Sequence, residues 1–208
     1  MKQLLISVLE LIGSICAWIC PMPIVKCCAA ARNYFYTGYL RHRFARMGRS
    51  IFVWKVQKLR GERFMHIGDG NVFESDLQLT AWKNDVKNPS LSIGNNCLFR
   101  RGCHISVANS LIIGDNLLTG TNVLITDNAH GSSDYEALKL PPTERGIASK
   151  GPIVIGKNVW LGNNVCVMPG VTIGEGVIIG ANSVVTHDIP VYAIAAGVPA
   201  QIIKTKEK

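Results

Sequence analysis

An aliphatic residue recurs at every sixth position through the last third of the chain. The positions are Ile155, Leu161, Val167, Ile173, Ile179 and Val185, and most of them are followed by glycine. Small or β-branched residues, which suit a turning wall, stand four places later in each repeat: Val159, Val165, Val171, Val177 and Ser183. A period of six fits neither a helical turn nor the two-residue alternation of an ordinary strand. The pattern therefore predicts a solenoid in which each hexapeptide is one short strand and one corner.

The repeat extends toward the N-terminus with interruptions. It begins at Ile67 and, after an irregular passage at 82–89, resumes at Ile93. Before Ile113 the six-residue step slips by two residues, which predicts a bulge at one corner. We therefore expect one main all-β domain over 67–208, and a chain of 208 residues is long enough to bury a sizeable core there.

The repeat disappears between residues 131 and 152. This segment is rich in Ser, Lys, Pro and Glu. A connection of that length inside a regular fold is uncommon, and such loops are usually functional. We expect a long functional loop at 131–152.

The positive charge of the chain lies in residues 1–66. Eleven Lys and Arg stand there against Glu10 and Glu62, a surplus of +9, whereas residues 67–208 hold eleven against twelve, or −1, which together give +8. A basic segment can meet nucleic acid, an anionic membrane surface or an acidic substrate. No aromatic and glycine pattern favours nucleic acid, so we expect no nucleic-acid partner.

Residues 1–66 are expected to form a basic, partly apolar helical extension. The apolar run 4–20 has 17 residues and includes Glu10, short of the ~20 residues that a spanning helix needs. As a helix it carries one polar stripe, formed by Gln3, Ser7, Glu10, Ser14 and Ala17. This pattern favours an interfacial helix over a membrane span or a signal peptide.

Prolines separate this helix from a second one. Pro21 and Pro23 are expected to end the first helix, and 24–47 is expected to form the second, with arginines crowding its end. Two roles for 1–66 remain open: attachment to an anionic membrane surface, and packing on the open end of the solenoid.

The cysteines and histidines predict neither a metal site nor a disulfide framework. Seven cysteines are present with no CxxC pair, which fits a reducing compartment. Cys97, Cys103 and Cys166 lie inside repeats, where small buried cysteines are ordinary. Of the histidines only three fall in the repeat region, without the paired spacing of a zinc-binding β-prism.

His130 is the candidate catalytic base. It stands at the end of the segment 126–131, at the root of the long loop. An imidazole there can accept the proton of a hydroxyl near neutral pH. Asp127 and Asn128, which precede it, are candidate residues on the acceptor side. The alternative for His130 is an ordinary solvent-exposed loop histidine.

Trp160 interrupts the pattern of small residues just before Leu161. Its indole is expected to point out of a wall, either covering a ligand on the acceptor side or simply packing there. The adjacent Gly162 and Asn163 could present a backbone N–H to a developing oxyanion.

Four segments carry a resemblance to a known family: 155–162, 169–174, 180–186 and 196–200. They resemble the hexapeptide-repeat acyltransferases, in particular the branch of galactoside and maltose O-acetyltransferases and the relatives that modify capsule or lipopolysaccharide sugars. The resemblance covers roughly 91–204 and leaves 1–66 outside.

The resemblance implies a left-handed parallel β-helix, an exception to the usual right-handed crossover. It further implies a homotrimer with acetyl-CoA in the groove between neighbouring chains. In that arrangement His130 is the general base, Trp160 flanks the site, and the N–H of Asn163 stabilises the tetrahedral oxyanion.

The cofactor contacts that the resemblance implies match less fully. Ala181 and Thr186, with Gly162, stand where the family touches coenzyme A. His187 and Gln201 occupy places where relatives often carry Lys and Arg for its phosphates, and Lys204 keeps a cation. Gly102 stands where the galactoside enzymes have an acceptor-binding asparagine, so their sugar specificity does not transfer.

These observations predict a cytoplasmic, trimeric, acetyl-CoA-dependent O-acetyltransferase. Its acceptor is expected to be a sugar hydroxyl of a glycan or a lipid-linked precursor, and its basic N-terminus is expected to hold it at the inner face of the cytoplasmic membrane. The alternatives are an acetyltransferase for a xenobiotic or a serine acceptor, a non-catalytic β-helix scaffold, and a metal-dependent hydratase like the γ-class carbonic anhydrases.

Overall fold

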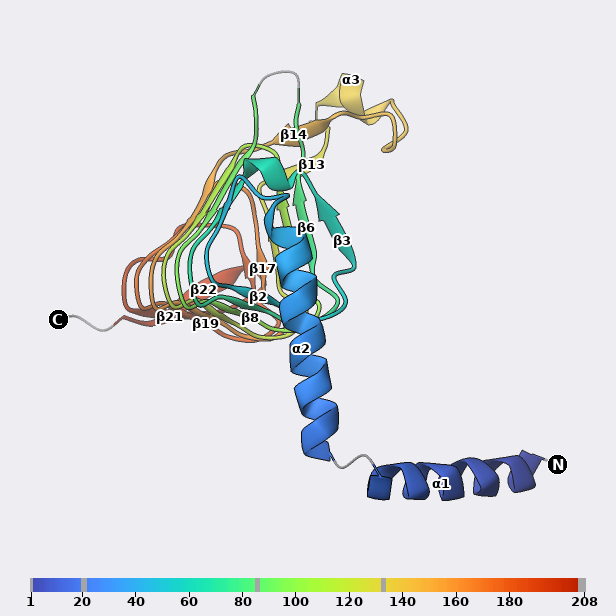
Figure 1. Ribbon diagram of the computed structural model, residues 1–208. Coiled ribbons are helices and arrows are strands. Elements are labelled where there is room, and N and C mark those ends of the chain that lie inside the picture. Colours follow the sequence, from blue (N-terminus) through green and yellow to red (C-terminus); the bar gives the residue numbers. More distant parts are fainter. Residues whose placement is uncertain (1, 20–21, 85–86, 132–133, 206–208) are drawn as a thin grey trace.

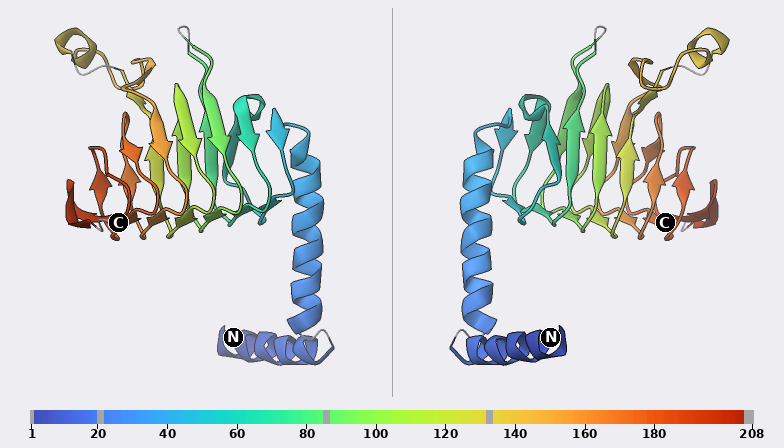
Figure 2. Two further views of the ribbon diagram at one scale, coloured as in Figure 1. Left: turned by 90° about the vertical axis from the view of Figure 1, so that its left-hand side faces the viewer. Right: turned by 90° about the vertical axis from the view of Figure 1, so that its right-hand side faces the viewer.

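The protein is a triangular β-prism with two helices at its N-terminal end. A computed structural model describes residues 2–19, 22–84, 87–131 and 134–205. Figure 1 looks along the prism, whose three walls enclose the core, and Figure 2 shows the strands stacked side by side along its length. The strands within the walls pair in parallel apart from the last two, so the chain forms the left-handed parallel β-helix that the sequence predicts.

Each wall is one sheet, named A, B or C in the order in which the chain visits them. Sheet A contains β1 (Arg46–Met47), β4 (Met65–Ile67), β7 (Ser90–Ile93), β10 (Ser110–Ile113), β15 (Ile153–Ile155) and β18 (Thr172–Ile173). Sheet B contains β2 (Ile51–Phe52), β5 (Val72–Phe73), β8 (Leu98–Phe99), β11 (Leu118–Thr119), β16 (Trp160–Leu161), β19 (Ile178–Ile179), β21 (Ala193–Gly197) and β22 (Ala200–Thr205). Sheet C contains β3 (Lys58–Arg60), β6 (Gln78–Ala81), β9 (His104–Val107), β12 (Leu124–Thr126), β17 (Cys166–Val167) and β20 (Val184–Val185).

The repeated aliphatic residues form the core of the prism. All six of those that define the period are buried: Ile155, Leu161, Val167, Ile173, Ile179 and Val185. Toward the N-terminal end phenylalanines take over this position in sheet B. The rings of Phe52 and Phe73 stack at 4.6 Å between centroids, and those of Phe73 and Phe99 at 4.7 Å. One continuous apolar column therefore runs along the axis.

The N-terminal boundary differs from the sequence prediction. The helices are α1 (Lys2–Ile19) and α2 (Met22–Arg41), so the second helix ends before the expected position 47. Residues 46–66 are not helical, apart from the short 3-10 turn η1 (Glu62–Phe64), and supply the first coil, because β1, β2 and β3 pair in parallel with β4, β5 and β6. The β-helix thus starts one coil before Ile67. Pro21 lies outside the described residues.

The end of α2 covers the open N-terminal end of the prism (Figure 2). Thr37 and Leu40 are buried there, and the Thr37 hydroxyl oxygen accepts a hydrogen bond of 2.9 Å from the Phe52 N–H. By contrast, the side chains described in α1 are all exposed. No single described helix is both long and apolar enough to cross a membrane, and only α1 and α2 taken as a bent pair satisfy that test.

The corner between sheets C and A carries the irregularities of the fold. The slip before Ile113 is explained by β9, which continues to Val107 and leads into an enlarged corner at Ala108 and Asn109. The next coil inserts the long segment 131–152 at the same corner, at the top of Figure 1. Both departures from the repeat therefore lie at one edge of the prism.

The described parts of the long loop contain regular secondary structure. β13 (Asn128–His130) pairs antiparallel with β14 (Ile147–Ser149), and α3 (Tyr135–Leu138) lies between them. Within the loop the Arg145 guanidinium donates hydrogen bonds to the carbonyl oxygens of Leu140 and Leu138, at 2.9 and 3.1 Å. These contacts hold the loop as a compact projection from the corner.

Candidate functional site

A groove of about 480 Å³ runs along the outer face of sheet C and ends at His130. Outward-facing side chains of β3, β6, β9 and β12 form its floor, and β13 and β14 close one end. The lining residues are Lys58, Gln78, Thr80, Trp82, His104, Ser106, Leu124, Thr126, Asn128, Ala129, His130 and Ile147. The groove is large enough for a sugar ring and brings one strong candidate base to its edge.

β13 fixes the backbone of His130. The residue is exposed and lies opposite Ile147 of β14, and the following Gly131 N–H donates to the Gly146 carbonyl oxygen at 2.6 Å. Gly131 has a positive φ of 72°, so the chain can turn away into the loop directly after the histidine. The imidazole is therefore accessible to solvent while its backbone is held.

Asp127 does not face the acceptor, contrary to its predicted role. Its side chain is fully buried, and its carboxylate accepts hydrogen bonds from the N–H groups of Ala108, Asn109 and Ser110 at 2.7 to 2.9 Å. The enlarged corner would otherwise leave these donors without partners. Asp127 is a structural residue that anchors this corner.

Asn128 lines the groove, and its role toward the acceptor stays a prediction. Its amide nitrogen donates to the Ser106 hydroxyl oxygen at 3.2 Å and to the Asp127 carboxylate at 3.0 Å. These contacts orient the half-buried amide two residues before His130. Asp127 therefore affects the groove indirectly, because its carboxylate accepts a hydrogen bond from Asn128 and holds the backbone of the corner.

His104 shares the groove with His130. Burial lowers the pKa of its imidazole, and the positive charge of Lys58 lowers it further. The lowered pKa keeps His104 neutral near pH 7, so it offers one N–H donor and one ring acceptor to a ligand.

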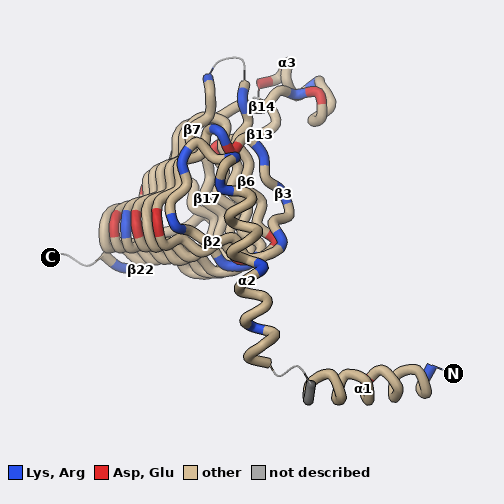
Figure 3. Tube along the Cα trace, in the orientation of Figure 1, with Lys and Arg blue, Asp and Glu red and all other residues tan. Residues whose placement is uncertain are grey.

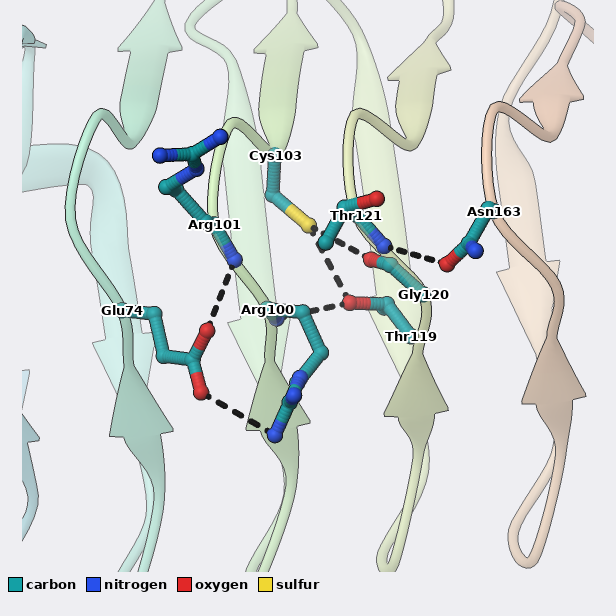
Figure 4. Close-up of polar contacts among 8 residues, drawn as sticks. All are labelled: Glu74, Arg100, Arg101, Cys103, Thr119, Gly120, Thr121 and Asn163. Atoms are coloured by element: carbon teal, nitrogen blue, oxygen red, sulfur yellow. Dashed lines mark hydrogen bonds and ion pairs between the residues drawn. The ribbon is translucent and has the colours of Figure 1, made fainter.

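The corner between sheets B and C holds the second predicted group (Figure 4). The Thr121 N–H donates to the Asn163 side-chain oxygen at 2.9 Å. In the previous coil Glu74 forms an ion pair of 3.2 Å with Arg100 and accepts from the Arg101 N–H at 3.0 Å. Side-chain oxygens thus accept hydrogen bonds from the backbone N–H groups of Arg101 and Thr121 at this corner.

The backbone N–H of Asn163 has no such acceptor, and among the described residues the N–H groups of Ser75 and Ala181 at the same corner position form no hydrogen bond either. The corresponding residue of the next coil is Ala181, whose methyl group offers no acceptor. Among the described residues, no hydrogen bond from the Asn163 N–H is formed. A ligand oxygen at this corner would therefore meet a free donor, which is what oxyanion stabilisation requires.

Trp160 and Gly162 lie beside this corner. The Trp160 side chain is 49% exposed on the outer face of sheet B, between Leu118 and Ile178, so its indole points out of the wall as predicted. A Cβ on Gly162 would stand only 2.6 Å from the Ala181 nitrogen. Glycine is needed there for close stacking of the coils.

The remaining cofactor candidates are exposed at the C-terminal end of the prism. Thr186 and His187 follow β20, and the Thr186 hydroxyl lies 2.8 Å from Nδ1 of His187. Gln201 and Lys204 lie on β22, opposite Ala196 and Ile194 of β21. These residues lie on different walls of one chain.

One chain does not bring His130 and Asn163 together. Asn163 precedes sheet C, at the level of Thr121, whereas His130 follows it. The intervening strand residues span more than about 15 Å at ~3.3 Å per residue. The two groups lie at opposite edges of sheet C, so a site that uses both requires a second chain.

Sequence reasoning missed the groove residues nearest the N-terminus. Lys58 lies in a coil that the sequence pattern predicts to be part of the helical extension, and Trp82 opens the passage that the pattern predicts to be irregular. In the structure Leu59 pairs with Leu79, and Leu79 pairs with Ile105. These aliphatic residues are the sequence feature that could have aligned the first coils with the later ones. This feature is weak in the sequence because the first coils differ in length.

Gly102 stands at a corner position that asparagine occupies in the later coils. Asn122, Asn164 and Asn182 take this position with φ between 56 and 60°, and Gly102 has a φ of 76°. A Cβ at Gly102 would meet the side-chain oxygen of Asn122, so glycine leaves room for that amide. This coil therefore lacks the asparagine that the resemblance to the galactoside enzymes implies at 102.

No cluster of three His, Cys, Asp or Glu side chains arranged to hold a metal ion occurs within the part of the chain that the structure describes.

Known proteins share both the sequence and the fold. Residues 152–187 match the family described as bacterial transferase hexapeptide (six repeats). The chain is 37% identical over 150 residues to a putative lipopolysaccharide biosynthesis O-acetyl transferase, WbbJ, of Escherichia coli K12, which covers 70% of this chain and 74% of that protein. The chain belongs to the hexapeptide-repeat acetyltransferase family. Its acyltransferase class follows from this membership.

Further relatives agree with this assignment. The galactoside O-acetyltransferase of Escherichia coli K12 is 35% identical over 152 residues, covering 73% of this chain and 69% of that protein. A solved galactoside acetyltransferase in complex with coenzyme A superimposes with a TM-score of 0.52 at 29% identity, over 81% of this chain and 68% of that one. AntD, an N-acyltransferase from Bacillus cereus solved with dTDP and coenzyme A, has a TM-score of 0.61 at 18% identity, over 79% and 85% of the two chains, and shares the fold.

Proposed function

We propose that this hexapeptide-repeat acetyltransferase transfers an acetyl group from acetyl-CoA to a sugar hydroxyl, with His130 as general base. The observation that carries the proposal is the position of His130, exposed on a fixed strand at the end of a groove of about 480 Å³. The named O-acetyltransferase relatives support the reaction class. A lipopolysaccharide or related surface glycan is the acceptor class that fits them.

The reaction is a direct transfer in this proposal. His130 takes the proton of the acceptor hydroxyl as its oxygen attacks the thioester carbonyl. The Asn163 N–H stabilises the oxyanion of the tetrahedral intermediate, which then collapses and expels the thiolate of coenzyme A. The proton on His130 returns to that sulfur, so the base is regenerated.

A homotrimer completes the site. Since His130 and Asn163 lie at opposite edges of sheet C, the base of one chain meets the oxyanion donor of its neighbour. Acetyl-CoA then lies between chains. The residues available to contact it are Trp160, Gly162 and Ala181, together with the exposed residues of the C-terminal end, which are Thr186, His187, Gln201 and Lys204.

The other functions have less support. A xenobiotic or serine acceptor would use the same base and donor, so only the acceptor specificity separates these alternatives. A non-catalytic scaffold would explain neither the exposed histidine beside the groove nor the Asn163 N–H, which has no hydrogen-bond partner among the described residues. A hydratase of the γ-class type would need a pair of closely spaced histidines on one coil edge, and the repeat region has no such pair.

Thiol reagents should leave the activity intact. Burial raises the pKa of the Cys97 thiol to about 11 and also raises that of Cys103. Both thiols therefore stay mainly protonated at pH 8 and react slowly there. We expect iodoacetamide to label the exposed Cys16, Cys27 and Cys28 without loss of acetyl transfer, as measured by mass spectrometry and kinetics. Inactivation in step with modification of a prism cysteine would instead indicate an acyl-enzyme.

We also propose that α1 attaches the enzyme to the inner face of the cytoplasmic membrane. Its apolar residues, such as Leu4, Leu9 and Leu11, are 58 to 72% exposed, and cations of residues 1–66 follow it in the chain. An apolar helix together with basic residues is enough for peripheral binding to anionic lipid. The end of α2, which covers the prism, does not account for α1.

Deleting residues 1–19 should abolish flotation with anionic liposomes. The shortened chain keeps α2 on the prism, so it should remain folded and active on a water-soluble acceptor. Flotation of both chains with vesicles that contain 30% phosphatidylglycerol, followed by kinetics of the unbound fraction, provides the test. Equal flotation of the two chains would contradict the role of α1, as would aggregation of the shortened chain.

A further inference from the structure

Two cations of β3 lie against the Trp82 ring at one end of the groove. Lys58 lines the groove, and Arg60 lies beside it on the same ring. The Lys58 ammonium lies 5.1 Å from the centre of the Trp82 ring, and the Arg60 guanidinium lies 4.1 Å from it. Both side chains are exposed, and neither forms an ion pair with a carboxylate of the described residues. The two positive charges are therefore available to a ligand.

No described residue that lines the groove carries a negative charge to offset them. Its titratable lining residues are Lys58, His104 and His130, and no carboxylate is among the described residues that line it. The Asp127 carboxylate behind this wall is fully buried and bonded to three backbone N–H groups. Within the part of the chain that the structure describes, an anion entering the groove thus meets cations and uncharged groups.

Trp82 gives these cations a defined place. Its indole N–H donates to the Thr80 hydroxyl oxygen at 3.1 Å, which holds the half-buried ring against sheet C. An arginine stacked on an aromatic ring keeps the N–H donors at the edge of its guanidinium plane free for a bidentate partner. The ammonium of Lys58 adds a second charge from the same strand.

We propose that this groove binds an acceptor sugar that carries a phosphate or diphosphate, with Lys58 and Arg60 contacting the phosphate and the sugar reaching His130. This inference rests on the proposed acetyl transfer and names its acceptor class. Phosphate suits the pair because it presents several anionic oxygens to one forked and one compact cation. Sugars linked to a nucleotide and sugars linked to a lipid both carry this group.

The test compares each sugar with and without phosphate. The acceptors are galactose 1-phosphate and glucose 1-phosphate, each against its methyl glycoside. We expect Lys58→Gln and Arg60→Gln each to lower the kcat/KM ratio of phosphate to methyl glycoside by about tenfold or more, the effect of losing one charge-assisted contact. Arg32→Gln is the matched control. Arg32 lies on α2, away from the groove, and its guanidinium is 5.9 Å from the centre of the Trp54 ring.

Binding measured without turnover separates this inference from the proposed reaction. In a His130→Ala background, calorimetry should show that Lys58→Gln weakens galactose 1-phosphate binding by about tenfold or more. That result stands even if no sugar is acetylated, in which case only the proposed function fails. An unchanged affinity and an unchanged kcat/KM ratio in both variants would overturn the inference, and so would equal binding of galacturonate.

Two further acceptors distinguish the source of the phosphate. UDP-galactose represents soluble nucleotide sugars, and a polyprenyl diphosphate galactose in detergent micelles represents lipid-linked sugars. The acceptor with the higher kcat/KM identifies the source, provided that Arg60→Gln lowers that value. A preferred acceptor that is insensitive to both groove variants would contradict the role of the cations.

Discussion

Replacing His130 by alanine is expected to lower the rate of acetyl transfer by about a hundredfold or more. A positioned general base contributes roughly 10²–10⁴ to such a reaction. The side chain is exposed and makes no core contact, so its removal leaves the fold intact. The loss should therefore appear in kcat, because the acceptor hydroxyl loses its proton acceptor while the groove keeps its shape.

Steady-state kinetics with acetyl-CoA and a sugar acceptor measure this loss, and light scattering checks that the oligomer is unchanged. His66→Ala is the matched control, since His66 is an exposed histidine on the outer face of sheet A. A His130→Ala enzyme that turns over like the control would remove His130 from the mechanism.

Replacing Asp127 by alanine should act on stability instead. The substitution leaves three backbone donors of a buried corner without their acceptor. Each unpaired donor costs about 1–3 kcal/mol, although water reaching Asn109 and Ser110 reduces the sum. We expect the free energy of unfolding to fall by about 2–4 kcal/mol, as measured by denaturant titration.

Asp188→Ala provides the comparison for Asp127. Asp188 is exposed at the corner between the same two sheets and accepts one hydrogen bond, from the Thr172 N–H at 2.7 Å. Its loss should cost no more than about 1 kcal/mol. A raised KM for the sugar with normal stability in Asp127→Ala would restore Asp127 to the acceptor side.

The sequence by itself determined the regular part of the fold. Once the period of six placed Ile155, Leu161 and Val167 on successive walls, their burial followed, because each hexapeptide turns the chain by one corner. The slip before Ile113 likewise predicted an irregular corner. A periodic pattern needs no long-range information, since each coil repeats the preceding one.

The first coil was beyond this local reasoning. Residues 46–66 keep one repeat glycine, Gly48, but lack the regular aliphatic spacing of the later repeats, and their inward positions include aromatic residues such as Phe52. Phe52, Phe73 and Phe99 form one column only after coils of unequal length are aligned. Local pattern therefore assigned this coil to the helical extension, whereas pairing with β4, β5 and β6 decided its structure.

The candidate site divides in the same way. His130 and Asn163 could be predicted from the sequence because each stands at a landmark, the root of the long loop and a glycine corner. Adjacency in the chain suggested that Asp127 faces the acceptor, but the enlarged corner of the preceding coil turns its carboxylate inward to three N–H groups. Only the stacking of coils decides which side chains share a wall, and so only the tertiary structure placed Lys58 and Trp82 in the groove of His130.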